Sequence, residues 1–209
     1  QQGREQGLNG EVLKSLEAQL PPITHGRKDS SSGPSQKQIS KLFDHFQKGQ
    51  LDESETLAIS ITKEFPLHQV GWKALGAIYG QTGKISESLV PNQKSVQLAP
   101  HDAQAHYNLG NTFKKLDRLT EAEASFREAI SLEPGFAVAY YNLGNTYKEM
   151  GRFDDAAANY NQTIALKPEH TEAYNNLGVT LQELGKFTEA EASYNQAIAL
   201  KPDYASAHR

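Results

Sequence analysis

Three asparagines stand 34 residues apart in the sequence, at Asn108, Asn142 and Asn176. A second pair, Asn111 and Asn145, follows three residues after the first two. An asparagine side chain donates and accepts hydrogen bonds, so it can pair with the C=O and the N–H of a peptide bond. A ladder of such side chains would match the backbone of an extended chain, each bond contributing about 0.5–1.5 kcal/mol.

Tyrosines and lysines recur beside these asparagines. Tyr107 and Tyr141 each precede an asparagine, and Lys114 and Lys148 follow it by six residues. Together with Lys115, the lysines give a positive bias that favours a neutral to acidic ligand. The residues that we predict to bind a peptide are Asn108, Asn111, Asn142, Asn145, Asn176, Tyr107, Tyr141, Lys114 and Lys148.

A period of 34 residues organises most of the chain. It places prolines at Pro66, Pro100, Pro134, Pro168 and Pro202, and glycines at Gly76, Gly110, Gly144 and Gly178. Within one unit, apolar residues follow helical spacing in two stripes, Leu109, Phe113 and Leu116, then Ala122, Phe126, Ala129 and Ile130. The proline ends the second helix because it cannot continue one. We therefore expect two antiparallel helices per unit, and a solenoid of such units.

Other positions of the unit resemble the tetratricopeptide repeat. The places of each repeat are numbered from the residue that stands seven before its glycine, so that the glycine is the eighth. The fourth place holds a large residue or His, at Trp72, His106, Tyr140 and Tyr174, and the seventh holds Leu75, Leu109, Leu143 and Leu177. The twentieth is small, at Ser88, Ala122, Ala156 and Ala190, and the twenty-fourth is usually aromatic, at Phe126, Tyr160 and Tyr194. The resemblance implies an all-α, right-handed α-solenoid, or superhelix, of antiparallel helix pairs.

The match covers residues 35–202 and divides the chain into segments. The five predicted repeats are 35–68, 69–102, 103–136, 137–170 and 171–202. Residues 1–34 form an N-terminal segment, with a short amphipathic helix predicted at 10–20 and a flexible linker after it. Residues 203–209 look like the truncated start of a sixth repeat.

Two of the predicted repeats depart from the pattern. In the first, Leu42 stands where glycine is expected, as in an atypical terminal repeat. In the second, Pro91 falls inside the second helix, where a proline destabilises the helix by roughly 3 kcal/mol. That helix is kinked, begins late, or tolerates the irregularity; we favour the last.

Helical phase separates the asparagines from the predicted core. Because an α-helix turns about 100° per residue, the second, sixth, ninth and thirteenth places lie opposite the fourth, seventh, eighth and eleventh. The resemblance implies that this opposite face lines a concave ligand groove. The arrangement of the asparagines on this face is similar to the asparagine ladder in the helical arm of the O-linked N-acetylglucosamine transferases. A clamp for a terminal carboxylate is not expected, because Glu172 and Asn176 stand where such a clamp needs Lys and Arg.

Composition excludes several other kinds of function. A net charge of −4 without a basic stripe argues against nucleic acid, and no apolar run is long enough to span a membrane. The absence of Cys excludes disulfides and thiolate metal sites but leaves the compartment open. His101 and His106 are five residues apart, which is the wrong spacing for metal ligands on one helical face. With no nucleophile–base pair or phosphate loop, we expect no catalysis, cofactor or metal.

The leading hypothesis is a protein-interaction module that binds an extended segment of a partner protein in its groove. An alternative is the non-catalytic, substrate-recruiting arm of a larger transferase or oxygenase. A third hypothesis is a self-assembling scaffold, which associates through the exposed solenoid ends or the N-terminal helix.

Overall fold

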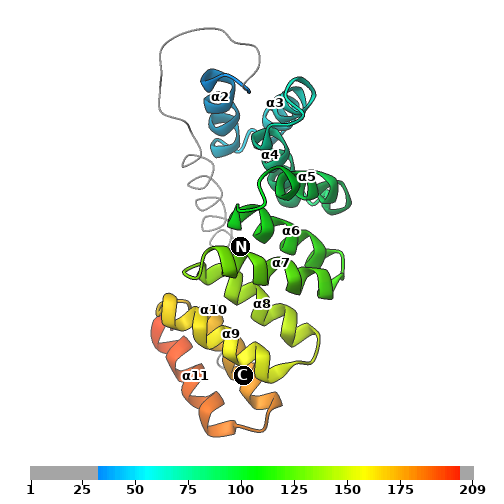
Figure 1. Cartoon of the computed structure of the whole chain (residues 1–209). Helices are drawn as coiled ribbons and strands as arrows, with labels where there is room; N and C mark the ends of the chain where they lie inside the picture. The colour runs from blue at the N-terminus through cyan, green and yellow to red at the C-terminus, as the bar shows by residue number, and fades with distance from the viewer. Residues whose placement is uncertain (1–32, 203–209) are drawn as a thin grey trace. The chain divides into compact units, whose positions relative to one another are not determined.

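The computed structural model describes residues 33–202, and within this range it contains ten helices and no strand (Figure 1). The helices are α2 (Gln36–Gln47), α3 (Leu51–Glu64), α4 (Gln69–Gln81), α5 (Ile85–Leu98), α6 (Ala103–Lys115), α7 (Leu119–Leu132), α8 (Ala137–Glu149), α9 (Phe153–Leu166), α10 (Thr171–Glu183) and α11 (Phe187–Leu200). The predicted all-α helical-repeat fold is confirmed. None of the described helices is long and apolar enough to cross a membrane.

The described residues form two compact units, which we treat separately: unit 1, up to Thr112, and unit 2, from Phe113 onward. The boundary falls inside α6. The predicted helix at 10–20, its linker and the start of a sixth repeat lie outside the described residues. The division into five repeats stays a prediction.

The turns inside the helix pairs need a left-handed backbone conformation, which reverses the chain. Gly83, Gly151 and Gly185 adopt it with φ of 78°, 72° and 71°. Asp117 takes the same place between α6 and α7, with φ of 59°. Glycine reaches this conformation without steric cost, and Asp is one of the few other residues that tolerate it.

Unit 1 has an apolar core between α2, α3 and α4. Ile39 and Leu42 from α2, Ile61 from α3, and Leu75 and Ile78 from α4 are buried together. Leu42 is only 1% exposed, so the first helix pair packs a large side chain where the other pairs have glycine. The helix α2 begins with a capping box, in which Ser35 and Gln38 each bond the other's backbone N–H.

Pro91 lies inside a single helix, α5, which begins at Ile85, the place where the other second helices begin. A late start of this helix is therefore wrong, and the chain tolerates the proline. The next residue, Asn92, occupies the twenty-fourth place, which is aromatic in the later repeats. Its Nδ2 donates to Thr112 Oγ1 at 2.9 Å, and Thr112 also bonds Ser88 at 3.0 Å. This buried contact is polar rather than apolar.

In unit 2, two tyrosine rings lie directly on glycines of the preceding helix. A Cβ atom added to Gly144 of α8 would stand 2.8 Å from Cε1 of Tyr160 in α9. A Cβ atom added to Gly178 of α10 would stand 2.6 Å from Cε1 of Tyr194 in α11. Such distances are well inside van der Waals contact, so these helix pairs require glycine at the contact.

We expect Gly144→Ala to destabilise the protein by about 1–3 kcal/mol, because the added methyl overpacks the contact with Tyr160. The matched control is Gly135→Ala, where no atom lies within 4 Å of the added Cβ. Urea denaturation measures both free energies of unfolding. Equal losses in the two variants would show that the Tyr160 contact does not require glycine.

Candidate peptide-binding surface

The helix α8 sorts its side chains between two sides, as helical phase predicts. Leu143 and Tyr147 are buried in the packing of unit 2. Tyr141, Asn142, Asn145 and Lys148 are partly exposed. The surface that they form, together with Asn176 of α10, is called here the Asn145 surface.

Asn145 and Asn176 are joined in one hydrogen-bond network. Asn176 Nδ2 donates to Asn145 Oδ1 at 2.9 Å and to the hydroxyl of Tyr141 at 3.0 Å. The hydroxyl of Tyr160 also donates to Asn145 Oδ1, at 2.7 Å. Burial raises the pKa of Tyr160, which keeps its hydroxyl protonated as a donor. The network thus fixes the orientation of both amide groups.

The network leaves one donor group and one acceptor unused. Both hydrogens of Asn176 Nδ2 and the oxygen of Asn145 are engaged. Within the described part of the chain, Asn145 Nδ2 and Asn176 Oδ1 have no partner. Asn142 differs, since its Nδ2 donates to Val138 O of its own helix at 3.1 Å.

His170 stands beside Tyr141 at the start of α10. The two ring centroids are 4.7 Å apart, with the ring planes inclined by 34°. Nδ1 of His170 accepts the backbone N–H of Ala173 at 3.3 Å and so caps the helix. Burial lowers the pKa of His170, while Glu172 opposes this shift. The capping nitrogen is therefore held in its unprotonated form at neutral pH.

Glu149 lies near both predicted lysines of unit 2, and its carboxylate offsets part of their positive charge. Lys114 Nζ forms an ion pair with Glu149 at 2.8 Å. Burial lowers the pKa of Lys148; Glu149 opposes this shift and Lys114 adds to it. The predicted positive bias is reduced accordingly.

The three predicted site residues of unit 1 lie in a different setting. Tyr107 is only 1% exposed and Asn108 9%, whereas Asn111 is partly exposed. Helical phase predicts Asn108, at the sixth place, to lie opposite the core, yet Asn108 and the neighbouring Tyr107 are both buried. Asn108 Oδ1 accepts from Gln104 Nε2 at 2.9 Å. The role of all nine residues in ligand binding stays a prediction.

The described residues contain no group of three or more His, Asp or Glu that could hold a metal ion. His106 Nε2 instead lies 2.9 Å from the carbonyl oxygen of Pro100, at the end of the preceding helix pair.

Two family models, both described as tetratricopeptide repeat, match residues 103–136 and 141–205. The chain is a tetratricopeptide-repeat protein. No protein of curated function matches it in sequence.

Solved structures extend the likeness of this tetratricopeptide-repeat protein over most of its length. A crystal structure of MamA is 28% identical, with a TM-score of 0.73, and the match covers 78% of this chain and 96% of MamA. MamA 41-end from Desulfovibrio magneticus RS-1 is 16% identical, with a TM-score of 0.75 and coverages of 86% and 99%. YrrB, described as a TPR protein with an unusual peptide-binding site, is 17% identical, with a TM-score of 0.73 and coverages of 94% and 95%. For the two structures that are 16% and 17% identical, the likeness shows the fold alone.

Sequence reasoning missed Tyr160 and His170 as parts of this surface. Tyr160 stands at the aromatic twenty-fourth place of its repeat and was read only as packing. Its hydroxyl was the available signal, because Phe126 at the same place has none. His170 precedes α10, and its role as a helix cap was readable from its place before the first helical residue.

We expect the stability of unit 2 to fall as the pH drops below the ordinary His pKa of 6.5. The pKa of His170 is lowered in the folded chain, so on acidification the unfolded chain binds a proton at His170 before the folded chain does. This proton binding stabilises the unfolded chain relative to the folded one. His170→Asn keeps an oxygen that can cap α10 but cannot titrate. Thermal midpoints measured from pH 8 to pH 5 should therefore decline less steeply in this variant.

The other histidines are common to both proteins, so only the difference between the two slopes reports on His170. Parallel pH profiles would mean that His170 titrates in the folded chain as it does in the unfolded one.

Proposed function

We propose that the tetratricopeptide repeats of this chain bind an extended segment of a partner protein, and that unit 2 does so through the Asn145 surface. The observation that supports this is the pair of polar atoms that the network leaves unused, Asn145 Nδ2 and Asn176 Oδ1. A peptide unit presents one C=O and one N–H. The C=O accepts from Asn145, and the N–H donates to Asn176.

The fixed orientation of the two amides favours this role. A free asparagine loses side-chain entropy when it binds a ligand. Here Tyr160 and Tyr141 already hold the amides in place, so that cost is met during folding. Each hydrogen bond to a ligand contributes about 0.5–1.5 kcal/mol. Two bonds alone give weak binding, so a partner needs further contacts.

The ring stack of Tyr141 and His170 supplies a further contact. Aromatic rings bury a large apolar area and leave a polar edge exposed. The stack adjoins the asparagine pair, because the hydroxyl of Tyr141 accepts from Asn176. We assign it to a side chain next to the bound peptide unit. A peptide-binding site on the same fold has a precedent in YrrB, whose description names one.

This function predicts that Asn176→Ala and Asn145→Ala weaken binding about 2- to 10-fold each, the equivalent of one hydrogen bond. The probes are fluorescent ten-residue peptides, selected from a synthetic library for binding to the unaltered protein. Fluorescence anisotropy measures Kd. The matched control is Asn159→Ala in α9, whose Nδ2 donates to the backbone oxygen of Asp155 in its own helix.

N-methylation of single peptide bonds in the probe sharpens the test. Methylation removes one N–H, so at one position it should weaken binding to the unaltered protein but not to Asn176→Ala. Uniform effects along the probe, or equal Kd values for the two site variants and the control, would place binding elsewhere on the chain. Circular dichroism confirms that each variant keeps its helices.

A further inference from the structure

Lys148 is the charged member of the Asn145 surface. It follows Asn145 by three residues on α8, so the two side chains are neighbours on the surface of this helix. Tyr141 lies about one turn before Asn145, on the same stripe of the helix. Along α8, Asn145 therefore lies between the ring of Tyr141 and the ammonium group of Lys148.

The ammonium group of Lys148 is not in contact with a carboxylate. Within the part of the chain that the structure describes, its Nζ forms no ion pair and no hydrogen bond. Glu149 is near enough to interact with it electrostatically. The carboxylate of Glu149, however, lies 2.8 Å from Nζ of Lys114. Two ammonium groups thus depend on one carboxylate, and positive charge is in excess beside the asparagines.

The repeat offers Lys148 a partner that the structure does not use. Lys114 and Glu149 stand at the twelfth place of one predicted repeat and the thirteenth place of the next. The equivalent residues one repeat later are Lys148 and Glu183. Among the described residues, these two form no ion pair. Burial raises the pKa of Tyr194, and Glu183 adds to this shift, so Glu183 lies near Tyr194 instead.

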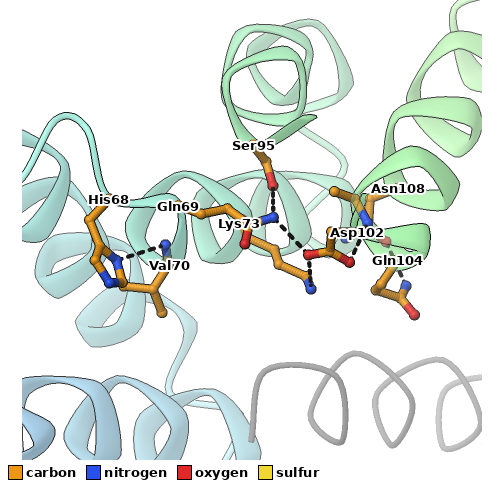
Figure 2. Close-up of polar contacts among 9 residues, drawn as sticks. His68, Gln69, Val70, Lys73, Ser95, Asp102, Gln104 and Asn108 are labelled. Carbon is orange, nitrogen blue, oxygen red and sulfur yellow. Dashed lines mark hydrogen bonds and ion pairs between the residues drawn. The ribbon is translucent and has the colours of Figure 1, made fainter. Parts of the chain in front are cut away.

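A lysine in unit 1 shows how the protein accommodates an ammonium group that it buries. Lys73 of α4 is fully buried, and its Nζ lies 2.6 Å from Asp102 Oδ2 (Figure 2). Burial lowers the pKa of Lys73, and Asp102 opposes this shift. Burial also lowers the pKa of Lys148, but there no carboxylate is in contact. A cation that is partly removed from water is stabilised by a carboxylate beside it, which at Lys148 a ligand can supply.

An extended peptide that is held by Asn145 passes within reach of Lys148. Residues three apart on a helix have Cβ atoms about 5–6 Å from each other, and an extended chain advances about 3.3 Å per residue. A side chain one or two residues from the peptide unit at Asn145 therefore reaches the ammonium group. Tyr141 lies on the opposite side of Asn145, so the ring stack with His170 contacts a different residue of the peptide.

We propose that Lys148 binds the carboxylate of an Asp or Glu side chain in the partner segment, one or two residues from the peptide unit that Asn145 and Asn176 hold. This inference rests on the proposed function, because it assigns a partner chemistry to the same surface. The asparagines bind the peptide backbone, which every sequence has. Lys148 selects among sequences, since a hydrogen bond between charged groups is about twice as strong as a neutral one.

The test combines a change in the protein with a change in the peptide. The probes are ten-residue peptides with amidated C-termini, selected from a synthetic library for binding to the unaltered protein. Each acidic residue of a probe is exchanged singly, Glu for Gln or Asp for Asn, which removes the charge and keeps the size. In the protein, Lys148→Gln removes the ammonium group. The matched control is Lys186→Gln, which removes an exposed lysine from the turn before α11, outside the Asn145 surface.

We expect the selected peptides to share an acidic residue at one position. Its exchange should weaken binding to the unaltered protein and to Lys186→Gln about 3- to 10-fold, and should leave the Kd for Lys148→Gln unchanged. Added salt should weaken binding of the acidic peptide more than that of the exchanged one. The acidic residue should lie one or two positions from the peptide bond whose N-methylation weakens binding.

Equal effects of the exchange in Lys148→Gln and in Lys186→Gln would overturn the proposal, as would selected peptides that share no acidic residue. A third variant, Glu183→Gln, tests the unused partner. If the charge exchange affects binding only in this variant, Glu183 occupies Lys148 in solution and the proposal is wrong. If it affects binding only when the C-terminus is a free carboxylate, Lys148 binds a chain end, and the proposal is wrong as well.

The two proposals fail on different measurements. Weaker binding by Asn145→Ala and Asn176→Ala, without any dependence on Lys148, would leave the proposed function standing and remove only the assignment of an acidic partner. Unchanged binding by both asparagine variants would remove the proposed function itself, whatever the charge exchanges show.

Discussion

The contact of Tyr160 with Gly144 is the interaction on which unit 2 depends. Glycine lets α9 approach α8 until the ring lies against the backbone. The hydroxyl of the same ring donates to Asn145, the next residue of α8. One side chain therefore packs two helices together and orients a polar group of the candidate site.

This coupling depends on which residues share a repeat. The ninth and twenty-fourth places hold Asn145 and Tyr160 in the fourth predicted repeat. The fifth repeat has Val179 with Tyr194, whose hydroxyl instead donates to Gln182 at 3.2 Å. In the second repeat, Asn92 replaces the aromatic ring and bonds Thr112. The same backbone plan thus produces different polar surfaces, through substitutions at two places.

Much of the fold was predictable from the sequence, because helix pairs follow from local spacing. Glycines, prolines and apolar stripes with a period of 34 residues indicate where helices begin and end, and α5 keeps this plan despite Pro91. The site was predictable only in part. Helical phase placed Asn142 and Asn145 on the exposed side, but phase on one helix says nothing about partners on other helices. The bonds from Tyr160 to Asn145 and the burial of Tyr107 and Asn108 depend on tertiary packing.

The double role of Tyr160 has a consequence for how such a protein changes over time. A residue that contacts only a ligand can be replaced without disturbing the packing, so at such a position recognition and folding can diverge separately. At Tyr160 they cannot, since exchange for phenylalanine keeps the packing but removes one of the two hydrogen bonds that orient Asn145, and exchange for a smaller residue opens the helix contact. Selection for a folded protein thereby also maintains one element of the candidate binding surface, and changes in its recognition should arise at the neighbouring positions instead.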